Sequence, residues 1–249
     1  ETGLTEGRLV RAIEIRPATA DGRKVVHHVL TLLEQREEGG IEGLAHEAHD
    51  VQQSAGLFME WSIGKTGEIF NPDAGKLMKA GSKVRFNMHY HSVGEEITDR
   101  SQVAFVFYPK AYVPKHVINT VLAPNQDDLD IPAGADNVRS DAYFKMEKPA
   151  RLIGFMPHMH NRGKRQCIEL IYPDNKTELI NCANWSFNWH LVSVYDDDVA
   201  PIYPAGTVLH VISWHDNSPN KDNPDPRNWV GSGQRTIDEM GFAWITWHD

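Results

Sequence analysis

The feature that most limits the fold of this chain is a series of short segments in which apolar and polar residues alternate. Side chains along a strand point to opposite faces in turn, so this period of two is typical of strands with one buried face. Gly, Pro and Asn separate the segments, and no long amphipathic helical pattern occurs. The sequence therefore predicts an all-β fold of antiparallel sheets packed face to face. The clearest segments are residues 8–15, 82–91, 104–108 and 207–214.

The length of 249 residues suits either one large β domain or two domains of ordinary size. The alternation lapses in one long turn-rich segment, residues 123–134, which is dominated by Pro, Asn, Asp and Gly. Segments of this composition commonly join domains. We therefore predict two tandem domains, residues 1–122 and residues 123–249.

Composition and charge exclude several classes of partner. The chain is 41% hydrophobic and 24% charged, as expected for a soluble globular protein with a substantial core. Its formal charge of −9 and its lack of basic runs argue against nucleic acid or an anionic membrane surface as a partner. No segment approaches the roughly 20 apolar residues that a membrane-spanning helix needs. We expect neither a nucleic-acid nor a membrane partner.

The only cysteines, Cys167 and Cys182, flank two strand-like runs around a turn at Asp174 and Asn175. If these two residues form a two-residue turn, residues whose numbers add to 349 face each other across the hairpin, and the cysteines form such a pair. Alternation would make this a hydrogen-bonded pair with Cα atoms about 5.5 Å apart, within the range of a disulfide. The register predicts a disulfide and a secreted or periplasmic protein, with two free thiols as the alternative.

Histidines gather at several positions and suggest metal binding. His158 and His160 share one face of a strand, where two imidazoles can close on one ion. Adjacent His27 and His28 point to opposite faces of a regular strand, so they reach one ion together only at a strand end or where the backbone twists. His89 lies on the polar face of the segment 82–91. A lone histidine is more often a solvated or structural residue. The prediction of metal binding therefore depends on these histidines occurring in one chain.

The type of ligand favours copper. Imidazole suits both copper and zinc, but a thioether favours Cu(I), and Met240 follows the histidine pair of the second half. A zinc hydrolase with three histidines would leave Met240 and the second histidine set unexplained. His46 and His49 form a further His-x-x-His pair in a polar stretch, where we expect them to be solvated, with an accessory metal role as the alternative.

Four segments, taken in order and spacing, resemble the copper type II, ascorbate-dependent monooxygenases. This family includes peptidylglycine α-hydroxylating monooxygenase, dopamine β-monooxygenase and bacterial relatives, and the resemblance covers nearly the whole chain. It implies two jelly-roll-like antiparallel β-sandwiches that face each other across a cleft. The segments are Val26-His27-His28-Val29, Met88-His89-Tyr90, Pro157-His158-Met159-His160 with Arg162-Gly163-Lys164, and the run 236–240 that ends in Met240.

The resemblance also implies two copper ions per chain and a role for each. An all-histidine site in the first domain would store an electron, and a His/His/Met site in the second would activate O2 and hydroxylate a substrate C–H bond. Ascorbate or a similar reductant would restore both ions. The alternative is a non-catalytic copper-binding or copper-transfer protein on the same scaffold. The implied ligands are His27, His28 and His89 for the first site, and the catalytic set His158, His160 and Met240 for the second.

The chain departs from the peptide-amidating members at three positions. Where those members hold the peptide carboxylate with an arginine, an asparagine and a tyrosine, this sequence has Met156, Phe242 and Trp244. These side chains offer an apolar and aromatic wall and no cation for a carboxylate. We expect a small apolar or aromatic substrate and not a glycine-extended peptide. The alternative is that all three residues belong to the core.

Overall fold

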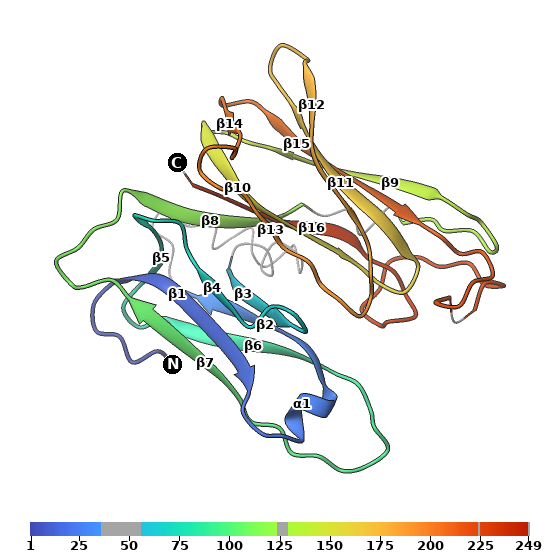
Figure 1. The fold of residues 1–249 in the computed structure, drawn as a ribbon, viewed down its shortest axis with the longest axis horizontal. Helices are drawn as coiled ribbons and strands as arrows, with labels where there is room; N and C mark the ends of the chain where they lie inside the picture. Colours follow the sequence, from blue (N-terminus) through green and yellow to red (C-terminus); the bar gives the residue numbers. More distant parts are fainter. Residues whose placement is uncertain (36–55, 124–128, 224, 249) are drawn as a thin grey trace. The chain divides into compact units, whose positions relative to one another are not determined.

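A computed structural model describes residues 1–35, 56–123, 129–223 and 225–248 and confirms the all-β prediction (Figure 1). The chain divides into two compact units, Glu1–Val121 with His248 and Leu122–Trp247. No helix among the described residues is long and apolar enough to cross a bilayer. The pair His46 and His49 lies outside the described residues.

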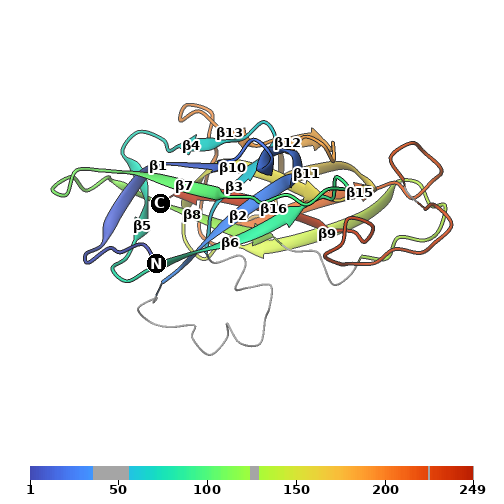
Figure 2. The same ribbon diagram turned by 90° about the horizontal axis from the view of Figure 1, so that it is seen from below.

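Two sheets build the first unit. In one, β1 is flanked by β7 on one side and by β5 and β4 on the other, and β8 runs parallel to β5. In the other, β2 lies between β3 and β6, and Figure 2 shows β6 beside β2. The elements are β1 (Arg8–Pro17), α1 (Gly22–Val25), β2 (Val26–Glu34), β3 (Leu57–Ser62), β4 (Gly67–Ile69), β5 (Ala74–Met78), β6 (Lys83–Tyr90), β7 (Ser101–Phe107) and β8 (His116–Ala123).

The core of the first unit lies between its sheets. One buried cluster contains Val10 and Ile15 from β1, Val29 from β2, and Phe58 and Met59 from β3. Alternation explains which side chains of β6 join it, because Val84, Phe86 and Met88 pack against this cluster. The polar face of β6, which carries His89, is thereby turned away from the core.

The second unit also has two groups of strands. Strands β12, β11, β15 and β9 form one antiparallel sheet in that order, and β10 pairs with β13, β14 and β16. Both groups contribute fully buried side chains, such as Phe155 of β10 and Leu170 of β11. The strands are β9 (Val138–Lys145), β10 (Ala150–Met159), β11 (Gly163–Ile171), β12 (Thr177–Asn184), β13 (Ser193–Val194), β14 (Ile202–Tyr203), β15 (Val208–His215) and β16 (Gly241–His248).

The predicted disulfide is confirmed, but the hairpin that positions it differs from the prediction. Cys167 pairs with Cys182 across β11 and β12, and their sulfurs are bonded. The turn holds three residues, because the Tyr172 N–H donates to the Lys176 carbonyl, and Asn175 adopts a left-handed φ of 67°. Ile168 pairs with Asn181 and Glu169 pairs with Leu179, so β12 has one extra residue between these pairs. This bulge restores the register in which the two cysteines face each other.

The spacing of the cysteines also differs from the prediction. Their Cα atoms are 4.1 Å apart, and not the 5.5 Å expected for a hydrogen-bonded pair. The extra residue in the bulge shifts the alternation of the ladder, so the cysteine pair is as close as a non-hydrogen-bonded one. A bond of this kind persists in oxidising compartments.

Candidate metal centres

The first histidine cluster lies where β2 begins. Val26 pairs with Tyr90, but His28 pairs with His89, so β2 has one more residue than β6 over this stretch. The extra residue is His27, and a bulge of this kind changes the direction of a side chain. The bulge supplies the backbone twist that adjacent histidines need in order to face the same side.

The structure brings His27, His28 and His89 together. The Nδ1 atoms of His27 and His28 are 2.8 Å apart, and the rings of His28 and His89 stack with centroids 3.9 Å apart. Two nitrogens that each lie ~2.0 Å from one ion at a right angle are ~2.8 Å apart, so the first pair already has the spacing of two ligands. His28 is buried and the other two rings are half-buried. His27 and His28 thus have the spacing of two imidazole ligands, and His89 contacts this pair by stacking on the His28 ring.

The second cluster lies where β10 ends and β16 begins. His158 is the penultimate residue of β10, and His160 directly follows the strand instead of lying within it. Their ring centroids are 5.7 Å apart. Met240 immediately precedes β16, which pairs with β10. All three side chains are buried, and this donor set of two imidazoles and a thioether fits copper.

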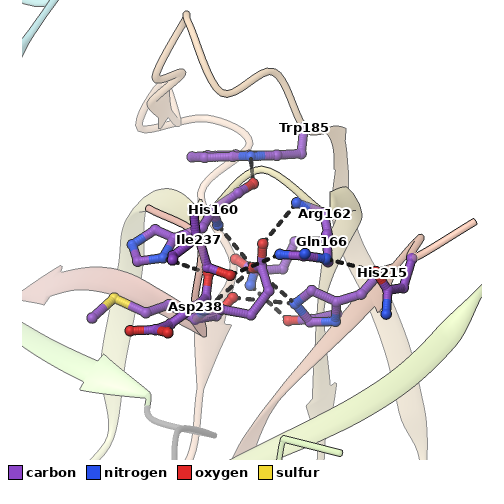
Figure 3. Close-up of polar contacts among 11 residues, drawn as sticks. His160, Arg162, Gln166, Trp185, His215, Ile237 and Asp238 are labelled. Carbon is purple, nitrogen blue, oxygen red and sulfur yellow. Dashed lines mark hydrogen bonds and ion pairs between the residues drawn. The ribbon is translucent and has the colours of Figure 1, made fainter. Parts of the chain in front are cut away.

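One buried carboxylate joins the two segments of this cluster. Glu239 Oε2 accepts hydrogen bonds from the backbone N–H of His160 at 2.9 Å and of Met240 at 3.2 Å, and its Oε1 accepts from the Arg162 N–H at 2.7 Å. Glu239 is fully buried, and burial raises the pKa of its carboxyl to about 7. Figure 3 shows the surrounding polar network with His160, Arg162 and Asp238.

His160 is held at three points. Besides its N–H bond to Glu239, its carbonyl accepts the indole N–H of Trp185 at 2.9 Å, and its Nδ1 lies 3.1 Å from the Asp238 carbonyl (Figure 3). A carbonyl only accepts, so Nδ1 donates to it, and the neutral ring then carries its lone pair on Nε2. Metal-binding histidines are commonly oriented in this way.

His215 supports the other side of the same network. Its Nε2 donates to the Met240 carbonyl at 3.2 Å and lies 3.6 Å from Glu239 Oε2. Complete burial lowers the pKa of His215 to about 4, so the ring is neutral near pH 7 and its contact with Glu239 is not an ion pair.

Arg162 ties this network to the long polar loop at 216–229. Its guanidinium donates to Asn217 Oδ1 at 2.7 Å, to the Ile237 carbonyl at 2.9 Å and to the Asp225 carbonyl at 3.2 Å. Asn217 in turn donates to the carbonyls of Pro132 and Asn228. Side-chain to backbone bonds thus hold the described residues of this loop, 216–223 and 225–229, in place.

Replacing the guanidinium of Arg162 tests how much its hydrogen bonds to the loop contribute to stability. We expect Arg162→Lys to lower the free energy of unfolding by roughly 1–2 kcal/mol, because an ammonium group cannot serve three acceptors arranged around a planar fork. Urea unfolding followed by tryptophan fluorescence measures the loss. The control is Arg227→Lys, whose side chain is 89% exposed and whose change should stay within about 0.5 kcal/mol. Equal effects of the two substitutions would contradict the role given to Arg162.

Aromatic residues surround His158. Phe242 stacks on its ring with centroids 4.4 Å apart, and Trp244 contacts Phe242 edge-on at 5.7 Å. Met156 is buried on β10 two residues before His158. Phe242 thus contacts His158, Trp244 contacts Phe242, and all three side chains are buried.

The sequence reasoning missed His190. Its ring centroid lies 5.4 Å from that of His158 and 5.2 Å from the ring of Trp185, and the side chain is buried. One ring nitrogen of His190 lies within 4.8 Å of one of His158. The segment that carries it has no regular strand pattern, so nothing in the sequence linked it to the His-x-His pair.

No protein-family model matches the chain, and no curated protein matches it by sequence. Solved structures of infectious bursal disease virus can be superposed on it. The structure of the Gx strain shares 10% identity over 100% of this chain and 59% of the viral chain, with a TM-score of 0.30. The VP2 subviral particle shares 11% identity over 98% and 58%, with a TM-score of 0.28. The chain thus spans under two thirds of these viral chains, and scores this low support no inference about function.

Proposed function

We propose that this chain is a copper-dependent monooxygenase that hydroxylates a substrate C–H bond with O2 and electrons from ascorbate or a similar reductant. The observation that carries the proposal is the second cluster. His160 and Met240 are far apart in the sequence, yet their backbones donate to the same oxygen of Glu239. A separate cluster of three histidines accompanies it in the first unit. Two centres with different ligands suit chemistry that moves electrons one at a time.

The overall reaction places one oxygen atom of O2 in the C–H bond and releases the other as water, with two electrons from the reductant and two protons. Copper, when bound, supplies the one-electron and O2 chemistry. His158, His160 and Met240 would hold one ion, and His27, His28 and His89 the other. The Asp238 carbonyl orients the His160 ring, so that Nε2 is the atom available to the ion.

The surroundings of His158 support an apolar or aromatic small-molecule substrate. Phe242 and Trp244 supply an aromatic wall, and Met156 adds an apolar side chain nearby in the sequence. No cation occupies these positions, so a peptide carboxylate would lack its anchor there. The disulfide supports a secreted or periplasmic site of action, because disulfides persist in an oxidising compartment.

Copper stoichiometry tests the proposal. We expect the native chain to retain two copper ions after loading and dialysis, and Met240→Leu to weaken Cu(I) binding at one site about tenfold, because leucine matches the volume of methionine without its sulfur. Competition with a colorimetric Cu(I) chelator measures the affinity. The matched control is Met159→Leu, which removes a fully buried thioether between the two histidines and should leave the affinity unchanged.

Turnover separates an enzyme from a copper carrier. With copper and ascorbate, the native protein should consume O2 in step with the hydroxylation of an apolar or aromatic compound. Copper binding without substrate-dependent O2 consumption would favour the copper-transfer alternative. Retention of one ion or none, with no effect of Met240→Leu, would contradict the paired-centre proposal altogether.

A further inference from the structure

The candidate ligands of the second centre come from separate parts of the chain. His160 follows β10 and Met240 precedes β16, so the two belong to different strands. Their side chains meet at one ion only if the ends of these strands are fixed relative to each other. A ligand set drawn from two strands therefore needs a crosslink close to the ligands.

Glu239 has the position of such a crosslink. Its Oε2 takes the N–H groups of His160 and Met240, one from each segment, at 2.9 and 3.2 Å, and its Oε1 takes the Arg162 N–H at 2.7 Å. Each N–H belongs to a ligand residue or to a residue two positions from one. The carboxylate therefore acts directly on the backbone that carries the ligands.

The bonds of Glu239 are unusual for a buried acid. Burial disfavours a carboxylate, and a basic side chain normally compensates for it. The charge of the Arg162 guanidinium lowers the pKa of Glu239, but the hydrogen bonds of that guanidinium go to Asn217, Ile237 and Asp225. Three main-chain N–H groups donate to Glu239, at 2.7, 2.9 and 3.2 Å, and such bonds stabilise a carboxylate. Burial of this acid is unfavourable, so its position suggests a structural role near the ligands.

We infer that Glu239 is a positioning residue of the second copper centre, which fixes the separation of His160 and Met240 by accepting both of their backbone N–H groups. This inference rests on the proposed function. It does not place Glu239 in contact with the ion or with substrate. Glu239 instead sets the position of the thioether ligand, and through it the preference of the centre for Cu(I).

Glu239→Gln is the direct test. A glutamine has one carbonyl oxygen and one NH2, so in either orientation at least one of the three N–H groups loses its acceptor. We expect the Cu(I) affinity of the second centre to fall about tenfold, as is typical when an outer partner of a metal ligand is lost. We also expect the sulfur contribution to the Cu(I) X-ray absorption spectrum to weaken. The first centre should keep its affinity.

The matched control is Glu169→Gln on β11, whose carboxylate pairs with His210 and takes no part in this network. It should keep both copper ions and the Cu–S signal. A folded Glu239→Gln protein with native Cu(I) affinity and an intact Cu–S signal would overturn the inference, because a merely structural acid would lower stability alone. If Glu239→Gln does not fold, Glu239→Asp keeps both acceptor oxygens but shortens the reach, and the same two readouts apply.

Two failures can be told apart. If the native chain itself shows no Cu–S signal, the proposed function and the inference both fall. If the native chain shows the signal and Glu239→Gln keeps it unchanged, only the inference about Glu239 falls. Weakened Cu(I) binding in Glu239→Gln, with native binding in Glu169→Gln, supports both.

Discussion

Replacement of both cysteines by alanine is expected to lower the free energy of unfolding of the second unit by about 3 kcal/mol. Cys167 and Cys182 close a loop with a sequence separation of 15, and a crosslink of that length restricts the unfolded chain by this amount. Alanine is the suitable replacement because Cys167 is buried and a serine would add a hydroxyl group there. Six of the seven tryptophans follow residue 180, so fluorescence during urea unfolding reports on this unit.

A reductant supplies the control for this prediction. Native protein unfolded in the presence of a strong phosphine reductant should approach the midpoint of the double variant, while the double variant itself should not respond. A loss below about 1 kcal/mol in the double variant would mean that the unfolded hairpin is already restricted without the crosslink.

A second large effect is expected at Lys76, a buried lysine in the first unit. Its Nζ donates to the carbonyls of Leu57 at 3.4 Å and Phe58 at 2.8 Å and to Thr120 Oγ1 at 3.1 Å. The ammonium also lies 5.5 Å from the ring centroids of Phe58 and Phe70. These contacts offset part of the cost of burial, but burial still lowers the pKa of Lys76 to about 8.

The stability of the first unit should therefore rise with pH. Between the folded pKa of about 8 and the unfolded value of about 10.4, the unfolded chain binds more protons at Lys76 than the folded chain does. The free energy of unfolding then increases by up to roughly 1.4 kcal/mol per pH unit, or about 3 kcal/mol across the window. In Lys76→Met this increase should disappear. Urea unfolding at intervals from pH 7.5 to 10.5 measures the difference between the two proteins.

Lys83→Met is the matched control, because Lys83 is an exposed lysine on β6 of the same unit. It should retain the pH dependence of the native protein. If Lys76→Met keeps the full increase as well, groups other than Lys76 are responsible for it, and the low pKa assigned to this ammonium is wrong.

Period-two alternation was sufficient to predict the fold class, because the buried face of each strand leaves a direct mark on the sequence. On β6, Val84, Phe86 and Met88 pack against the core as their spacing indicates. The cysteine pairing was also predictable, although two local features that alternation does not encode were missed. The third residue of the turn and the extra residue of the bulge in β12 offset each other, so the assumption of a two-residue turn gave the correct cysteine partner but the wrong Cα separation.

The candidate ligands could be named from the sequence, but the groups that hold them could not. A His-x-His pair and an isolated methionine have recognisable types and spacing. The acceptor role of Glu239 depends on the N–H groups of residues about 80 positions away, and the closeness of His190 to His158 depends on an irregular segment. Long-range backbone contacts of this kind leave no local pattern.

The bulge at His27 has a consequence for searches of other β proteins. A rule that admits only alternate histidines as chelating pairs would discard His27 and His28, whose Nδ1 atoms are 2.8 Å apart. One inserted residue brings together the rings of neighbours that should diverge. Equally, deleting a single residue between Val26 and His28 would restore a regular ladder and dismantle the pair without removing any other histidine. The closeness of these two adjacent histidines thus depends on a backbone irregularity in β2.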